Sequence, residues 1–243
     1  MKRMLSLSLA ALLLAGTAPA QQNRPAPAGQ DARPGIAVLD FDIGATIGQD
    51  PDDYQALRRG LASMTLNELT ANNQVRVVER AQLQQIMQEQ NLGREGRIEA
   101  GTAANIGRIV GARYMVTGTL YDVRGNMRVD ARIINTETSE IVRTMRVDGR
   151  MDNLFGMVEN LARELMTNAN LPPLQRGAAD QHRQQNPAPP TAAVMAYSRA
   201  VLYADRGDTE RAVEQYRRAI QAFPQYTQAK TDCNRLQAGA CGA

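Results

Sequence analysis

The apolar positions of this chain change their spacing from one segment to the next, and each spacing predicts an element. Residues 36–41 form a nearly continuous apolar run, interrupted only by Asp40. Such a run is typical of a strand that is covered on both faces and central in its sheet. Residues 43–52 are polar and predict a loop, after which Asp52 or Asp53 can cap a helix. The apolar residues that recur at helical spacing in it are Leu57, Leu61, Met64 and Leu69.

Shorter elements follow this first helix. Residues 75–78 are rich in valine and predict a second strand, and residues 81–91 carry an apolar side that predicts a second helix. Thr102 can cap a third helix, and Gly111 can end it. These three elements leave little spare sequence between them, as expected of a compact module.

The spacing of the apolar residues then changes to two. Between residues 127 and 133, apolar side chains alternate with charged ones, which predicts a strand with one buried and one solvated face. Turns are predicted at residues 124–126 and 135–139, on either side of this strand. Residues 141–147 predict the last strand, and residues 154–166 carry an apolar stripe that predicts a closing helix.

The predicted order is β-α-β-α-α-β-β-β-α, which is an α+β class. A strand-helix-strand start requires a crossover, whereas the last three strands can form an antiparallel meander, so the sheet is predicted to be mixed. We assign this domain to residues 35–169. The segments around it are a disordered leader at residues 21–34 and a proline-rich, semi-extended linker at residues 170–190.

The C-terminal segment at residues 191–237 has its own pattern, and residues 238–243 are a short tail. Small and aromatic residues fall at the spacings of a tetratricopeptide repeat, with residues 225–236 as a capping helix. A single repeat cannot bury its own face, so it must dock on the first domain, on a second copy or on a partner. The positions in register are Ala200, Tyr203, Gly207, Ala212, Tyr216, Ala219 and Pro224. The candidate partner-binding residues are Tyr197, Tyr203, Tyr216 and Tyr226.

The N-terminus predicts export. Lys2 and Arg3 precede an apolar run at residues 5–14, and the small residues 18–20 form a cleavage site after Ala20. The run is shorter than the roughly 20 apolar residues that span a bilayer. Thr17 stands where a lipoprotein would carry its cysteine, so we expect a periplasmic protein without a lipid anchor, free or peripheral to the outer membrane.

The net charge and the cysteines bear on the kind of partner and on the compartment of the protein. Without Lys2 and Arg3, the 28 lysines and arginines fall to 26, against 25 aspartates and glutamates. A balanced charge spread along the chain argues against a nucleic-acid partner, which would favour a clustered basic face. The two cysteines, Cys233 and Cys241, can form a disulfide in an oxidising compartment or stay free in a frayed tail.

Candidate chemistry is sparse. Asp40 and Asp42 leave the first strand on the same face and could act on a metal or as acid and base, but such residues more often cap loops. His182 lies in the predicted linker, where no packed neighbours would orient it. For Glu79 and Arg80 we favour a helix-starting carboxylate and a salt bridge over a subunit contact. We therefore expect no enzyme, no cofactor and no small-molecule substrate.

Several separated segments of the first domain resemble the periplasmic domain of the CsgG family, which serves curli secretion. The resemblance covers roughly residues 35–169, in matching order and spacing. It is carried by residues 77–83 (VVERAQL), 104–107 (ANIG), 111–118 (GARYMVTG) and 132–141 (RIINTETSEI). It implies a protein of the bacterial cell envelope, related to oligomeric outer-membrane secretion channels.

The chain departs from that family pattern in two ways. It lacks the lipidation cysteine, and its connections at residues 123–127 and 148–150 are too short for membrane-spanning hairpins. We infer a periplasmic scaffold without the pore. The leading hypothesis is a non-enzymatic assembly or secretion accessory that binds envelope or secretion proteins and can form a homo-oligomer. The alternatives are a regulator of a cell-wall synthesis enzyme and, less favoured, an outer-membrane pore subunit.

Overall fold

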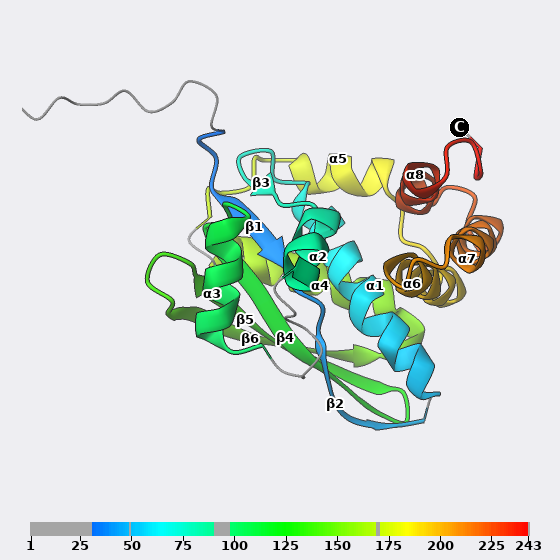
Figure 1. The fold of residues 1–243 in the computed structure, drawn as a ribbon, viewed down its shortest axis with the longest axis horizontal. Coiled ribbons are helices and arrows are strands. Elements are labelled where there is room, and N and C mark those ends of the chain that lie inside the picture. Colours follow the sequence, from blue (N-terminus) through cyan, green and yellow to red (C-terminus); the bar gives the residue numbers. More distant parts are fainter. Residues whose placement is uncertain (1–30, 49, 90–97, 169–170, 243) are drawn as a thin grey trace, which may run out of the picture. The chain divides into compact units, whose positions relative to one another are not determined.

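The computed structural model of this chain describes residues 31–48, 50–89, 98–168 and 171–242. Contacts divide the chain into two units, Met1–Ala32 and Arg33–Ala243, and all elements below belong to the second unit (Figure 1). The predicted signal peptide and most of the predicted leader lie outside the described residues.

A mixed six-stranded sheet is the centre of the fold. Its order is β3-β1-β4-β5-β6, and β2 also pairs with β4. β1 lies parallel to β3 and β4, whereas β4, β5 and β6 form an antiparallel meander. This arrangement confirms the predicted α+β class and mixed sheet. The strands are β1 (Gly35–Val38), β2 (Asp42–Ile47), β3 (Arg76–Val77), β4 (Tyr114–Val123), β5 (Asn126–Asn135) and β6 (Ile141–Arg150).

Strand β2 corrects the loop predicted at residues 43–52. β1 pairs only with the first part of β4, up to Val116, and β2 continues the same edge from Thr119 to Val123. Without β2, half of this ten-residue strand would lack backbone partners on that side, which is costly for buried groups. The loop prediction overlooked the alternation of Ile43, Ala45 and Ile47 with more polar or smaller residues, which is the period of two expected of a strand.

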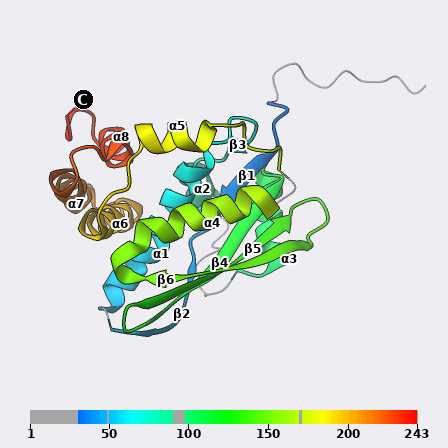
Figure 2. The ribbon, with the colours of Figure 1, turned by 180° about the vertical axis from the view of Figure 1, so that it is seen from behind.

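Two layers of helices cover the sheet. One face packs against α1 and α4, and the buried residues of the other face pack against α2 and α3. β1 contributes to both layers, Ile36 and Val38 to one and Ala37 and Leu39 to the other, as its continuous apolar run predicted. The helices α2 and α3 are in front of the sheet in Figure 1, and α4 is in front in Figure 2. The bounds are α1 (Pro51–Leu69), α2 (Arg80–Glu89), α3 (Ala100–Ile109), a 3-10 turn (Met151–Asn153) and α4 (Leu154–Asn168).

Local signals explain several boundaries. Asp50, rather than Asp52 or Asp53, caps α1, and its side chain accepts a hydrogen bond of 2.8 Å from the Asp52 N–H. Arg124 and Gly125 both have positive φ, which gives the tight turn predicted between β4 and β5. Gly107 of α3 allows close packing on the sheet, since a Cβ there would lie 2.3 Å from Thr136 Cγ2.

Four further helices follow α4, and the second of them packs on α1. Within the predicted linker lies α5 (Ala178–Gln185), which corrects the expectation of an extended segment. One continuous apolar core joins the sheet to the last three helices through α1. The C-terminal helices therefore dock on their own chain, which answers one question that the sequence left open. They are α6 (Thr191–Asp205), α7 (Thr209–Ala222) and α8 (Thr227–Leu236). We call α6–α8 the helical unit.

The helical unit closely approaches the first domain at Gly60 of α1. A Cβ at this position would lie 1.9 Å from Ser198 Oγ of α6 and 2.8 Å from its Cα. The two helices therefore touch backbone to backbone, which small residues alone permit. Among the described residues, no helix combines the length and apolar character that crossing a bilayer requires.

Candidate functional site

Four charged side chains meet where the helical unit joins the first domain. Asp40 follows β1, Arg59 belongs to α1, Arg80 begins α2 and Asp205 ends α6. Arg80 binds both carboxylates, with Nη2 2.8 Å from Asp40 Oδ1 and 2.6 Å from Asp205 Oδ2, and Arg59 Nε lies 3.3 Å from Asp205 Oδ2. Two arginines and two aspartates thus balance one another in what we call the seam cluster.

Burial and charge oppose each other in the seam cluster. Burial alone would lower the pKa of Arg80, but Asp40 and Asp205 outweigh it and raise that pKa above its ordinary value. Burial lowers the pKa of Arg59, which is the less tightly bound of the two arginines. Arg80 therefore carries a permanent charge, and its position confirms the predicted salt bridge at the start of the second helix.

The seam cluster includes Asp40, one of the two candidate acidic residues at the end of the first strand. Asp40 is engaged by arginines, whereas Asp42 begins β2 opposite Thr119. No group of three metal-ligating side chains occurs within the part of the chain that the structure describes. Asp40 is therefore an ion-pair partner at the end of β1, and Asp42 belongs to the edge of the sheet.

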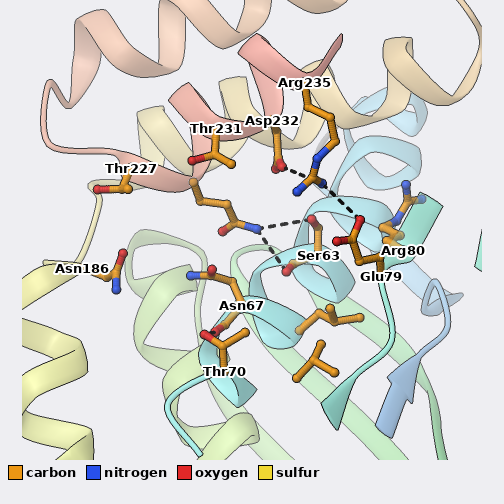
Figure 3. Close-up of a pocket in the computed structure, with 13 residues that line it drawn as sticks. Ser63, Asn67, Thr70, Glu79, Arg80, Asn186, Thr227, Thr231, Asp232 and Arg235 are labelled. Carbon is orange, nitrogen blue, oxygen red and sulfur yellow. Dashed lines mark hydrogen bonds and ion pairs between the residues drawn. The ribbon is translucent and has the colours of Figure 1, made fainter. Parts of the chain in front are cut away.

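Beside the seam cluster lies a groove of about 300 Å³. It runs between α1, the junction of β3 with α2, and α8, so its two walls come from distant parts of the sequence (Figure 3). Hydroxyl, amide and charged side chains dominate its lining, with Leu66 and Val77 as apolar contacts. The polar lining residues are Ser63, Asn67, Thr70, Glu79, Arg80, Asn186, Thr227, Gln228, Thr231, Asp232 and Arg235. We call this the seam groove.

A chain of hydrogen bonds fixes one wall of the seam groove. Tyr197 Oη donates to Asp232 Oδ2 at 2.7 Å and lies 2.7 Å from Ser63 Oγ. Gln228 Nε2 donates to the Ser63 carbonyl at 3.2 Å. These bonds link α8 to α1, so they position Asp232 at the edge of the groove. Burial raises the pKa of Asp232, although the Tyr197 hydrogen bond and Arg235 oppose that shift.

This raised pKa has a measurable consequence. A carboxyl whose folded pKa exceeds its unfolded value gives stability at low pH that is lost as pH rises through the folded pKa. We expect the wild type to lose more stability than Asp232→Asn as pH rises from about 4, the ordinary pKa of an aspartate, towards neutrality. Thermal unfolding of both proteins across that range measures the difference. Parallel curves for the two proteins would contradict the burial of an ionisable Asp232.

The structure corrects the expected role of the tyrosines. Tyr197, Tyr216 and Tyr226 are buried inside the helical unit and against α1, where they are unavailable to a partner. The ring centroids of Tyr197 and Tyr226 are 5.2 Å apart, and Tyr226 Oη lies 3.2 Å from Met64 Sδ. They are core residues. Tyr203 alone is half-buried, with the Arg211 guanidinium 4.8 Å from its ring centroid.

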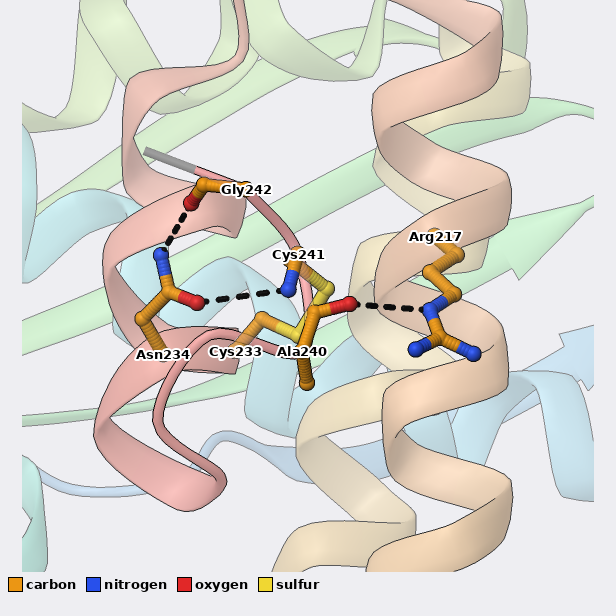
Figure 4. Close-up of a disulfide and its surroundings, with 6 residues drawn as sticks. All are labelled: Arg217, Cys233, Asn234, Ala240, Cys241 and Gly242. Atoms are coloured by element: carbon orange, nitrogen blue, oxygen red, sulfur yellow. Dashed lines mark hydrogen bonds between the residues drawn. A yellow bond between two sulfur atoms is a disulfide. The ribbon is translucent and has the colours of Figure 1, made fainter.

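The C-terminal tail is tied to the helical unit (Figure 4). A disulfide joins Cys233 of α8 to Cys241, one of the two states that the sequence left open. The Asn234 side chain accepts a hydrogen bond from the Cys241 N–H at 3.3 Å, and Arg217 Nε donates to the Ala240 carbonyl at 3.0 Å. These contacts hold the tail against α7 and the end of α8.

His182 is oriented, contrary to the expectation for a linker residue. Its Nε2 lies 3.2 Å from Glu68 Oε1, and both side chains are largely buried. Asn72 donates to the Pro172 carbonyl at 2.8 Å, which helps to hold the preceding segment beside the end of α1. The sequence carried no signal for this contact beyond the helix-compatible residues of α5.

A second polar surface lies on the sheet. Beyond the part covered by α3, the outer faces of β4, β5 and β6 line a shallow hollow of about 410 Å³. Arg128 pairs with Asp130, and Arg146 with Asp148, each two residues along the same strand. The charges of this face therefore compensate each other locally, and Arg128 also lies 5.2 Å from the centroid of the Tyr121 ring.

Comparisons with known proteins add a family likeness. The family model described as "Curli production assembly/transport component CsgG" matches residues 18–124. No curated protein matches this chain. The match to the family model confirms the predicted CsgG resemblance as far as the end of β4. The tetratricopeptide repeat stays a prediction.

Solved structures provide distant similarities. The LpoB C-terminal domain from Salmonella enterica is 18% identical, with a TM-score of 0.37, and the match covers 51% of this chain and 87% of that one. The PelC dodecamer from Paraburkholderia phytofirmans is also 18% identical, with a TM-score of 0.32, and the match covers 58% and 89%. The family that this chain is similar to is that of CsgG, through residues 18–124.

Proposed function

We propose that this chain is a non-enzymatic accessory protein of the cell envelope, which acts by binding other envelope proteins. The observation that carries the proposal is the match of residues 18–124 to the CsgG family model. Periplasmic export, predicted from the first twenty residues, belongs to the same proposal. The helical unit adds to this module a surface of its own.

The seam groove supports a binding role. It is open, mainly polar and built from two rigid parts, because one apolar core joins α1 to the helical unit. The charged residues with the strongest candidate chemistry, Asp40 and Arg80, bind each other beside it. A site with fixed walls and many hydrogen-bonding groups favours recognition of another molecule.

Site-specific crosslinking in the native host tests the proposal. A photo-crosslinking residue replaces Thr231, an exposed lining residue of the groove, or Glu214, an exposed residue of α7 that serves as the control. We expect a defined envelope protein at position 231 and not at position 214. The same species should disappear when Thr227→Trp fills the groove. No crosslinked envelope protein at position 231, or an equal yield with Thr227→Trp, would contradict the proposal.

The identity of the crosslinked protein separates the finer functions. A secretion or fibre-assembly component supports an assembly accessory, whereas a cell-wall synthesis enzyme supports a regulator. A second copy of this chain would instead support self-assembly. Mass spectrometry of the crosslinked species distinguishes these three results.

A further inference from the structure

The seam groove carries an unusual charge arrangement. Glu79 from the β3–α2 junction and Asp232 from α8 line it, with Arg235 near both (Figure 3). Arg235 Nη1 lies 3.5 Å from Asp232 Oδ1 and 3.9 Å from Glu79 Oε2. Both separations exceed the 2.7–2.9 Å of a charge-assisted hydrogen bond. The two carboxylates are thus near a cation without being tightly bound by it.

Arg235 is a weak occupant of this position. Its side chain is 57% exposed and the Glu79 side chain 67%, so solvent screens their attraction. Exposed ion pairs of this kind contribute about 0–1 kcal/mol. Arg80 also lines the groove, but its guanidinium already binds Asp40 and Asp205. The groove therefore keeps two carboxylates of which at most one is compensated, which makes its wall acidic.

The rest of the lining suits an extended polypeptide. Asn67, Thr231 and Gln228 present amide and hydroxyl groups that can bond to a peptide backbone. Leu66 and Val77 offer small apolar contacts for alternate side chains of an extended strand. No aromatic ring lines the described groove, which favours a peptide over a ligand that needs stacking. A volume of about 300 Å³ is at the small end of ligand sites and fits a short segment.

We propose that the seam groove binds an extended segment of a partner protein through an arginine or lysine, whose cationic group takes the place of Arg235 between Glu79 and Asp232. This inference rests on the proposed binding function and specifies the chemistry of the partner. A guanidinium can bond a carboxylate with two parallel N–H groups, so an arginine is the stronger occupant. Displaced Arg235 loses an exposed, screened contact with Glu79 and a 3.5 Å contact with the less exposed Asp232.

A titration of the isotope-labelled full chain with N-acetyl-arginine amide tests the inference by NMR. Its neutral isostere, N-acetyl-citrulline amide, is the matched probe. We expect arginine amide to shift the backbone signals of Glu79, Gln228 and Asp232, and citrulline amide to bind at least tenfold more weakly. Equal binding of the two probes, or shifts located elsewhere, would overturn the inference.

Three variants sharpen the test. Removing the internal competitor with Arg235→Ala should tighten arginine binding, by up to about fivefold for a contact of this exposure. Glu79→Gln should weaken it by up to about fivefold, and because Glu79 is exposed, this variant should fold normally. Glu214→Gln, on the outer side of α7, should leave it unchanged. Weaker binding of arginine amide to the Arg235→Ala variant would contradict the displacement of Arg235 by the ligand.

The outcome is separable from that of the proposed function. If position 231 crosslinks to an envelope protein but arginine amide does not bind in the groove, the inference fails and the proposed function stands. If arginine amide binds and no envelope protein crosslinks, the groove accepts a cationic side chain and the proposed function fails.

Discussion

Replacing Gly60 by alanine is expected to destabilise the protein by about 3 kcal/mol, because the new methyl group would meet the backbone of α6. Its Cβ would lie 1.9 Å from Ser198 Oγ, 2.5 Å from Ser198 Cβ and 2.8 Å from Ser198 Cα. Rotation of the Ser198 side chain relieves only the first contact, so α6 must shift away from α1. Chemical denaturation of the variant and the wild type measures the difference.

Gly101→Ala is the matched control for this prediction. Gly101 is also helical, in α3, but no atom of the described residues lies within 4 Å of the position of a new Cβ. Alanine should therefore stabilise α3 by about 1 kcal/mol through helix propensity alone. Changes of opposite sign in the free energy of unfolding at the two glycines would support the close contact between α1 and α6. A neutral or stabilising effect at Gly60 would contradict the backbone contact on which the docking of the helical unit depends.

Replacing Arg80 by methionine should cost about 3–5 kcal/mol, since it leaves two partly buried carboxylates without their main partner. Asp40 and Asp205 are 10% and 18% exposed at their side chains. Their mutual repulsion would favour protonation, so the variant should regain stability as pH falls, opposite to the usual effect of acid on paired carboxylates. Denaturation at about pH 7 and pH 5 measures both effects.

Two further variants interpret that result. Arg80→Met combined with Asp40→Asn and Asp205→Asn removes the unpaired charges and should recover part of the lost stability. Arg146→Ala breaks an ion pair on the sheet surface, where both side chains are 58% exposed, and should cost less than about 1 kcal/mol. If Arg80→Met costs no more than Arg146→Ala, the seam cluster does not stabilise the contact between the two parts.

The sequence predicted the elements whose signal is local. The continuous run of β1, the alternation in β5 and the stripe of α4 each define a buried face, so the α+β class and the mixed sheet followed from them. Gly111, with a φ of 68°, ends the third helix as its position indicated. The CsgG resemblance rested on short segments within the same region.

The sequence did not predict features that depend on contacts between distant segments. β2 extends the edge of β4 beyond Val116, and this partner is distant in the sequence, although the alternation of Ile43, Ala45 and Ile47 is a local strand signal. The tyrosines of the helical unit are candidate partner-binding residues in the sequence, whereas three of them are buried in the folded chain. The seam groove brings Glu79 and Asp232 together from distant parts of the sequence, so it exists only once the helical unit is docked on the first domain.

We propose that the seam groove is where this protein binds its envelope partner. Once crosslinking has identified that partner, calorimetry can compare its affinity for the wild type, Thr227→Trp and Glu214→Trp. Both variants add the same bulk at an exposed position, but only the first lies in the groove. We predict at least tenfold weaker binding for Thr227→Trp and wild-type affinity for Glu214→Trp. Equal affinity for all three proteins would place the partner elsewhere and contradict the claim.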